Sequence, residues 1–290
     1  MPHEKTVRLG YYASATGNVG DDLNLTLWPH FLGDMFSSDA ETIFLGIGSI
    51  LDQRYDGPNK KLVLGAGVRD PKTAPDLTAG NWDVRFVRGP LSAHALGLPE
   101  KVSISDPALL CPIVYPPPQK HRLTTQRRIG FIPYFRTDPI YAQLLCASAD
   151  LQYIPVTLSP ERFVAMLARC THVISEAMHG AILADAYHIP WRPCRISNIH
   201  HEGLTHVFKW GDWMASIGVE ADFLALPQLW ANPGKNLLHN LKLLATVRDG
   251  AKLLRAQARS PHWFLSNPGE IRDRQERMLN EIDILRINGS

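Results

Sequence analysis

Short apolar segments that run into glycine recur along this 290-residue chain, and they constrain its fold more than any other feature. In IFLGIGS and LVLGAGV, an apolar run is followed at once by glycines. A helical pattern over residues 90–96 follows another such run and stops at Gly97. Strands that end in glycine turns, with helices between them, indicate a parallel sheet and therefore an α/β fold. The strands expected in this half are residues 7–13, 42–45, 61–64 and 84–87.

A proline-rich stretch over residues 112–128 divides this pattern into two halves. Its consecutive prolines, Pro116 to Pro118, can continue neither a helix nor a central strand, so they form a semi-rigid spacer. The strand–helix pattern then restarts, which predicts a second αβ unit. The strands expected there are residues 128–133, 151–156 and 172–175, and the helices are residues 159–170 and 178–187.

Two helices, over residues 236–258 and 269–287, are expected to close the chain. The first carries a broad stripe of leucines among basic residues. This pattern favours an amphipathic helix that packs on a core. A basic helix lying on a membrane surface is the alternative.

The composition excludes several classes of protein. The net charge is +2 with neutral histidines, whereas nucleic-acid-binding proteins carry a strong basic excess or stripe. The four cysteines form no C-x-x-C pair, and scattered single cysteines suit a reducing compartment. No segment resembles a signal peptide, and none is apolar for long enough to span a bilayer. By elimination, we expect a cytoplasmic protein.

The first polar motif follows the first expected strand and contains Gly17, Asn18, Asp21 and Asp22. Ligands bind at the carboxyl ends of strands in open α/β sheets, and glycine lets the backbone approach a ligand. The alternative is that an aspartate caps the next helix. We expect capping to account for one aspartate, but not for both.

The second polar motif, ISEAMHGAI, lies between a strand and a helix. Ser175, Glu176, His179 and Gly180 would lie near the start of that helix, where N–H groups and the helix dipole favour an anion. A histidine there can also donate a proton near neutral pH. The alternative is a serine cap with a packed histidine.

Three arginines, Arg69, Arg88 and Arg136, lie near expected strand ends. The planar guanidinium group suits phosphate and carboxylate groups. Each arginine alone could equally form a surface ion pair, but three at strand ends indicate an anionic ligand.

A histidine-rich run and an aromatic run follow the second motif. His201 and His206 are five residues apart with a glycine between them, which does not fit the spacing of a zinc protease, and no metal site is expected. The aromatic run places Lys209 beside Trp210 and Trp213, a combination that suits sugar rings or ordinary packing. Neither the G-x-S-x-G motif of serine hydrolases nor the P-loop is present.

Several segments, in this order, resemble the polysaccharide pyruvyl transferase family, and in particular its short bacterial branch of the succinoglycan and xanthan type. The segments are GNVGDDLN (17–24), FLGIGSIL (44–51), LGAGVRD (64–70), VRGPLSAHALGL (87–98), SDPALL (105–110), SEAMHGAILADAYHIPW (175–191) and KWGDW (209–213). They span most of the chain up to Ser216, and the final stretch matches nothing.

The resemblance implies two Rossmann-like domains that face a cleft, as in GT-B glycosyltransferases. We assign residues 1–115 to an acceptor-side domain and residues 129–250 to a donor-side domain. A linker over residues 116–128 joins them, and residues 251–290 form a C-terminal helical extension.

The resemblance also implies phosphoenolpyruvate as a co-substrate, with no further cofactor, and an exopolysaccharide sugar or lipid-linked oligosaccharide as the acceptor that receives a pyruvate ketal. His179 falls on the histidine of the family's R-L-H-G-like motif, but Ala177 stands where many members carry arginine. Other groups must then bind part of the donor. The expected donor-binding residues are Arg88 first, then Arg136 and Arg69, with Ser175, Glu176 and Gly180.

For the chemistry, His179 is expected to donate a proton or to contact the phosphate, and Asp21 or Asp22 is expected to act as the base. The expected acceptor-binding residues are Gly17, Asn18, Lys209, Trp210 and Trp213. Two alternatives stay open: a GT-B glycosyltransferase that uses a nucleotide sugar, and a non-catalytic sugar-binding protein of the same pathway. Because the acceptor could be lipid-linked, contact with the inner face of the cell membrane is a further expectation.

Overall fold

The computed structural model describes residues 6–78, 80–117, 127–196, 204–229 and 237–289, and it is α/β with two parallel sheets. The chain divides into two compact units. Unit 1 comprises Met1–Pro116, Gly203–Glu220 and Ser266–Ser290, and unit 2 comprises Pro117–Glu202 and Ala221–Leu265.

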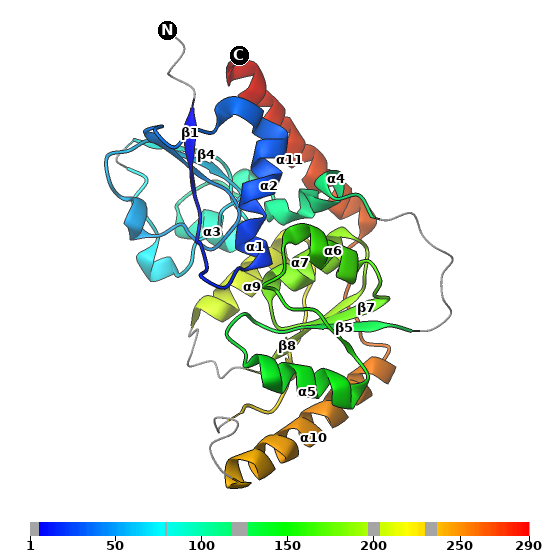
Figure 1. Ribbon diagram of the computed structural model, residues 1–290. Coiled ribbons are helices and arrows are strands. Elements are labelled where there is room, and N and C mark those ends of the chain that lie inside the picture. Colours follow the sequence, from blue (N-terminus) through cyan, green and yellow to red (C-terminus); the bar gives the residue numbers. More distant parts are fainter. Residues whose placement is uncertain (1–5, 79, 118–126, 197–203, 230–236, 290) are drawn as a thin grey trace. The chain divides into compact units, whose positions relative to one another are not determined.

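Unit 1 contains a four-stranded parallel sheet in the order β1-β2-β3-β4 (Figure 1). Its strands are β1 (Val7–Gly10), β2 (Thr42–Leu45), β3 (Lys61–Leu64) and β4 (Trp82–Phe86). Its helices are α1 (Val19–Asp22), α2 (Asn24–Leu32), α3 (Pro90–Ala95), α4 (Cys111–Val114), α9 (Leu204–Ser216) and α11 (Pro268–Gly289). Short 3-10 turns complete it at Gly33–Met35, Gln53–Tyr55, Pro71–Thr73, Glu100–Val102 and Pro107–Leu110.

Unit 2 contains a five-stranded parallel sheet in the order β6-β5-β7-β8-β9. Its strands are β5 (Ile129–Ile132), β6 (Gln152–Tyr153), β7 (His172–Ser175), β8 (Trp191–Arg195) and β9 (Leu224–Ala225). Its helices are α5 (Pro139–Ala149), α6 (Pro160–Leu167), α7 (Met178–Ala186) and α10 (Leu237–Arg259). The predicted α/β class and the parallel sheets are therefore confirmed.

The two units differ from the contiguous domains expected from the sequence. Helix α9 lies within the expected donor-side range but packs on α3 in unit 1, and α11 runs beside α2 in the same unit (Figure 1). Helix α10 crosses the expected boundary at residue 250 without a break and packs on α5 in unit 2. The packing of apolar helix faces determines which helices belong to each unit. Trp210 and Trp213 of α9, for example, are completely buried.

Helix α10 has one face in the core of unit 2 and another in solvent. Leu243, Val247 and Leu254 are buried in a cluster with Phe131 and Leu145. The core-facing amphipathic helix expected from the sequence is therefore present, but its leucine stripe is wider than the face that packs.

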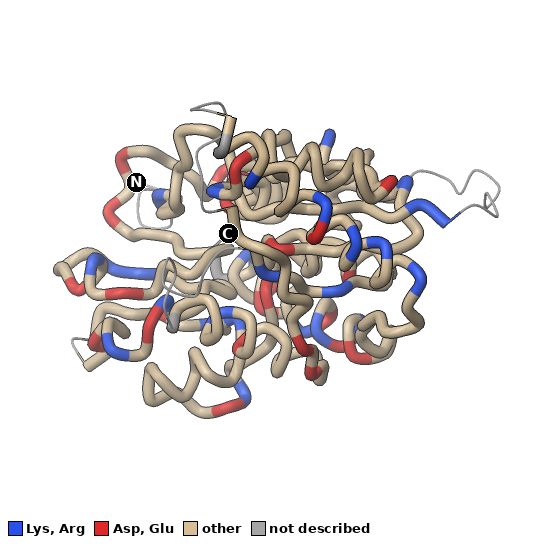
Figure 2. Tube along the Cα trace, turned by 90° about the horizontal axis from the view of Figure 1, so that it is seen from below, with Lys and Arg blue, Asp and Glu red and all other residues tan. Residues whose placement is uncertain are grey.

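Charged residues of both signs are interspersed along the described chain (Figure 2). This distribution agrees with the net charge of +2 and shows no long block of a single sign. None of the described helices combines the length and the apolar character needed to cross a membrane.

Candidate functional site

The strand order of unit 2 reverses between β5 and β7. The chain goes from β5 outward to β6 on one side, and then returns to β7 on the other side of β5. In open α/β sheets, ligands bind outside the carboxyl ends of the strands at such a switch point. Residues 133–138 leave β5 at this edge and carry Arg136. Residues 176–177 leave β7 and lead into α7, and Glu176 and His179 lie there.

Glu176 joins the loops that follow three neighbouring strands. Its carboxylate accepts hydrogen bonds from the backbone N–H of Tyr134 at 3.0 Å and from the Thr137 hydroxyl at 2.5 Å, both after β5. It also accepts from the backbone N–H of Ile196, after β8, at 3.0 Å. The side chain is 3% exposed. Glu176 therefore organises the edge of the sheet from within, and these contacts do not present its carboxylate to a ligand.

His179 is the second residue of α7 and is half-buried. The residue before the helix, Ala177, has an extended backbone and makes no side-chain cap. The Ser175 hydroxyl donates to the Ala177 carbonyl at 2.7 Å, so it supports this turn. The first N–H groups of a helix have no acceptor within the helix, and they favour an anion beside His179.

Gly180 lets α7 approach the sheet closely. A Cβ atom at this position would lie 2.4 Å from the Ser175 hydroxyl oxygen and 2.8 Å from Cγ2 of Ile132. Arg136, in the segment after β5, is exposed, and its guanidinium lies 5.2 Å from the centre of the Phe135 ring. Of the three expected donor-binding arginines, Arg136 alone lies in unit 2.

Hydrogen bonds within the first polar motif, which follows β1 in unit 1, hold its side chains in place. The Asp22 carboxylate accepts from the backbone N–H of Asn18 at 3.0 Å, and the Asn18 amide donates to the Asp21 carboxylate at 2.6 Å. The Asp22 carboxylate therefore holds the turn before α1, whereas the next helix, α2, has no side-chain cap, so the expected capping of that helix by an aspartate is not observed. The other carboxylate oxygen of Asp21 faces Gly48, where a Cβ atom would lie 3.5 Å from it. Gly17 forms the preceding turn with φ of 81°.

Asn24 ties this motif to the end of β2, a role that the sequence analysis missed. Its amide donates to the carbonyls of Asp21 and Ile47 at 2.9 and 3.0 Å. It accepts from the Ile47 N–H at 2.8 Å and from the Trp28 indole at 2.9 Å. The side chain is wholly buried. The spacing of asparagine four residues before tryptophan on one helix face was the available signal.

Arg88 is wholly buried in unit 1, and its guanidinium donates to Asp212 of α9 at 3.0 Å and to the Ser49 hydroxyl at 2.6 Å. Asp212 also accepts from the Ser92 hydroxyl at 2.6 Å and from its backbone N–H at 2.9 Å. The structure thus unites the segments VRGPLSAH and KWGDW through a buried ion pair. A donor-binding role for Arg88 stays a prediction, and this geometry does not expose its guanidinium.

The remaining predicted residues lie in different settings. Arg69 is exposed, and Lys209 is half-buried on α9. Trp210 and Trp213 are wholly buried, so neither indole presents a face to a sugar in this structure. His206 is also buried, and its ring centre lies 6.0 Å from that of Trp210, whereas His201 lies outside the described residues. Among the described residues, no group of three metal-ligating side chains is present.

Comparisons with known proteins identify the family to which the chain belongs. The family model of polysaccharide pyruvyl transferases matches residues 18–198, which include the polar motifs of both units. The succinoglycan biosynthesis protein ExoV of Rhizobium meliloti (strain 1021) is 34% identical over 214 residues. That match covers 72% of this chain and 64% of the relative, so the chain spans less than two thirds of the length of this curated protein. No solved structure matches significantly.

Proposed function

Because this chain belongs to the polysaccharide pyruvyl transferase family, we propose that it transfers the enolpyruvyl-derived group of phosphoenolpyruvate to an exopolysaccharide sugar or its lipid-linked repeat unit. The product is a pyruvate ketal, and phosphate is released. The relative's role in succinoglycan biosynthesis supports an acceptor of this class.

The observation that carries the proposal is the position of His179 at the switch point of the unit 2 sheet. His179 lies at the start of α7, directly after β7, and the exposed Arg136 lies in the segment after β5. A helix N-terminus and a guanidinium are groups that bind phosphate and carboxylate. Phosphoenolpyruvate carries both. We therefore give Arg136 the first place in donor binding and assign Arg88 a positioning role in unit 1.

The chemistry follows from these groups. His179 donates a proton to the methylene carbon of phosphoenolpyruvate, which makes C2 electrophilic, and a sugar hydroxyl adds to C2. The attacking hydroxyl loses its proton to a base, for which Asp21 and Asp22 are the candidates. A second hydroxyl of the same sugar then displaces phosphate from C2, closes the ketal and gives its proton to the departing phosphate. No metal or other cofactor takes part in this proposal.

Unit 1 supplies the acceptor side and unit 2 the donor side in this proposal, as in GT-B enzymes. Gly17 and Asn18 are the acceptor-side residues that the structure leaves half-exposed next to Asp21. Lys209 is half-buried and remains a candidate. The burial of Trp210 and Trp213 makes them supports of α9 rather than sugar platforms.

We also propose a cytoplasmic location. Peripheral contact with the membrane is part of this proposal, and the solvent-exposed face of α10 would make that contact. Leu237, Leu241 and Leu244 are 73%, 53% and 59% exposed, and their spacing places them along one side of the helix. Lys242 and Arg248 lie on the same helix and can bind anionic headgroups. A lipid-linked acceptor would be reached from such a surface.

The test is ligand-dependent thermal stabilisation combined with turnover. A ligand that binds only the folded state raises the unfolding temperature. We expect a rise with phosphoenolpyruvate, none with UDP, CMP or GDP, and acceptor-dependent release of phosphate with formation of a ketal. A rise with a nucleotide and none with phosphoenolpyruvate would instead indicate a glycosyltransferase.

A further inference from the structure

A polar cavity of about 330 Å³ lies within unit 1, beside the start of α3 and the end of α9. It forms where the loop that carries Lys101 and Ser103 meets the end of α9 at Ser216 and one side of α11. Its volume is at the lower end of the range for small-molecule sites, which is roughly 300–1,000 Å³. Its lining residues are Pro90, Glu100, Lys101, Ser103, Ala215, Ser216, Arg274 and Arg277.

The lining of this cavity, here called the basic pocket, favours an anion. Three basic side chains, Lys101, Arg274 and Arg277, line it against one acidic side chain, Glu100. Ser103 adds a hydroxyl. Few apolar residues line the cavity, so its chemistry suits a charged and hydrophilic ligand rather than an aromatic or acyl group.

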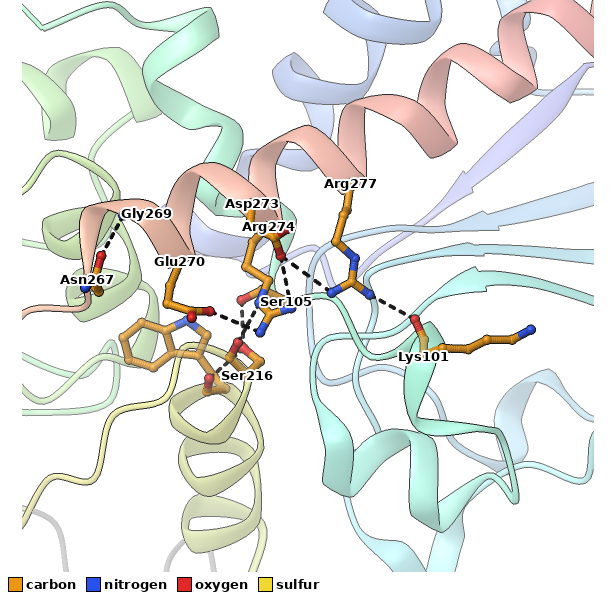
Figure 3. Close-up of polar contacts among 10 residues, drawn as sticks. Lys101, Ser105, Ser216, Asn267, Gly269, Glu270, Asp273, Arg274 and Arg277 are labelled. Atoms are coloured by element: carbon orange, nitrogen blue, oxygen red, sulfur yellow. Dashed lines mark hydrogen bonds and ion pairs between the residues drawn. The ribbon is translucent and has the colours of Figure 1, made fainter.

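Both arginines are held in place by backbone carbonyls. Arg274 donates from Nε to the Ser216 carbonyl at 3.0 Å, and Arg277 donates from Nη2 to the Lys101 carbonyl at 2.9 Å. Figure 3 shows the two side chains reaching from α11 toward these carbonyls. The other guanidinium nitrogens of Arg274 donate to the carboxylates of Asp273 and Glu270 at 3.4 Å each, so a ligand must replace these long contacts.

The carboxylates beside the arginines are exposed and only loosely placed. Asp273 lies 3.4 Å from Arg274 and 3.8 Å from Arg277, and Glu270 lies 3.4 Å from Arg274. Their side chains are 57% and 52% exposed, so these ion pairs are weak and easily exchanged for a stronger anion. In Figure 3 the Lys101 ammonium is directed away from the guanidinium groups. The two arginines are therefore the principal cations of the site.

We propose that the basic pocket binds the phosphate-bearing end of a small hydrophilic ligand, such as a sugar phosphate or a diphosphate. Two guanidinium groups three residues apart on one helix face lie side by side and can share a phosphate or contact two linked ones. The site uses none of the residues assigned to pyruvyl transfer. The proposal of a phosphate site can therefore be tested independently of pyruvyl transfer.

Calorimetric titration of the purified full chain with inorganic phosphate, pyrophosphate and a hexose phosphate tests the proposal. The variants are Arg277→Gln and Arg274→Gln, because glutamine keeps an N–H donor for the backbone carbonyl. The matched control is Arg272→Gln, which removes an exposed charge from the same helix outside the pocket. We expect affinity to fall about tenfold or more in each pocket variant, since a charge-assisted hydrogen bond is lost.

The control should bind within about twofold of the unmodified protein, because distant surface charges are largely screened. A larger loss of affinity for the hexose phosphate than for inorganic phosphate in the pocket variants would support a sugar phosphate as ligand. Equal losses of affinity for the two ligands would support recognition of the phosphate group alone. Absence of binding, or equal affinity in Arg277→Gln, Arg274→Gln and the control, would overturn the proposal.

A second comparison separates the basic pocket from the transfer site. His179→Ala should leave pyrophosphate binding unchanged while it reduces turnover by about 10²–10⁴-fold. If His179→Ala removes pyrophosphate binding and the pocket variants do not, the phosphate group binds at the transfer site and the basic pocket is not a ligand site. Unfolding temperatures measured without ligand confirm that each variant is folded.

Discussion

Arg88 and Asp212, separated by 124 positions in the sequence, form an ion pair of 3.0 Å whose two side chains are wholly buried. The pair connects the turn before α3 to helix α9 within unit 1. Two glycines make room for it. A Cβ atom on Gly67 would lie 2.3 Å from Cζ of Arg88, and one on Gly89 would lie 2.0 Å from the Asp212 carbonyl oxygen.

Asp212→Ala should lower the free energy of unfolding by about 3–5 kcal/mol, because it leaves the Arg88 charge buried without its partner. Replacing both residues, as Arg88→Met with Asp212→Leu, should cost less than the single change, since no charge is then stranded. Chemical denaturation measures both. Asp249→Ala, in an exposed pair with Arg248, is the control and should cost less than about 1 kcal/mol. A double variant as unstable as the single one would contradict this account.

His179→Ala should reduce turnover by about 10²–10⁴-fold, the usual contribution of a positioned proton donor. The unfolding temperature should change little, because His179 is only half-buried at a helix start. The measurement is acceptor-dependent phosphate release from phosphoenolpyruvate. His262→Ala, an exposed histidine in the same unit, is the matched control. Turnover within a factor of a few of the unmodified protein would remove His179 from the mechanism.

Glu176→Ala should destabilise unit 2 and also weaken donor binding. The change leaves the N–H groups of Tyr134 and Ile196 without their carboxylate acceptor, and each bond to a charged group is worth about 1.5–3 kcal/mol. Denaturation and the thermal effect of phosphoenolpyruvate measure the two consequences. Glu176→Gln keeps one acceptor oxygen, so its stability should lie between those of Glu176→Ala and the unmodified protein. Full stability together with lost turnover would point instead to direct chemistry by Glu176.

The pH dependence of stability should contain a contribution from His172. Burial, and secondarily the Arg127 guanidinium, lowers the pKa of His172 from 6.5 to about 4. Between these values the unfolded chain binds the proton and the folded chain does not, so stability falls as pH falls from 6.5 to 4. Urea denaturation across this pH range should show a smaller loss of stability for His172→Gln than for the unmodified protein. Identical pH profiles for the two proteins would contradict the assignment.

Binding to anionic vesicles should depend on the exposed leucines of α10. Replacing Leu241 and Leu244 by glutamine should reduce co-sedimentation with vesicles that contain an anionic lipid, because insertion needs apolar area as well as charge. The folded core should be unaffected, since both side chains are more than half exposed. Leu265→Gln, a partly exposed leucine outside this helix, is the control. Equal sedimentation of all three proteins would exclude α10 as the contact surface.

The sequence predicted much of the secondary structure because the local signals were strong. Apolar runs that lead into glycine became β2 and β3, and the Ser-Pro-Glu segment begins α6 at Pro160. The prediction was less accurate where no local signal existed. The first strand ends at Gly10 rather than at residue 13, and β6 is two residues long.

The candidate site was predicted only in part. The turn before α7 and the glycine-rich turn before α1 follow strands as expected, since their residues have strong positional preferences. The sequence could not reveal that the Glu176 carboxylate accepts hydrogen bonds from two other loops, because its partners lie up to 42 positions away. It also could not show that Arg88 is buried, because an arginine at a strand end looks the same whether it faces a ligand or a distant aspartate.

The sequence alone determined that this chain is α/β, which family it resembles and which turns carry polar residues. These properties depend on local patterns of apolar side chains, glycines and caps. The tertiary structure decided which of these polar residues are supports and which are open to a ligand. It also decided that α9 and α11 belong to unit 1, and it created the basic pocket between them. Such outcomes depend on contacts between residues far apart in the chain, where burial and charge pairing are set by packing rather than by sequence neighbours.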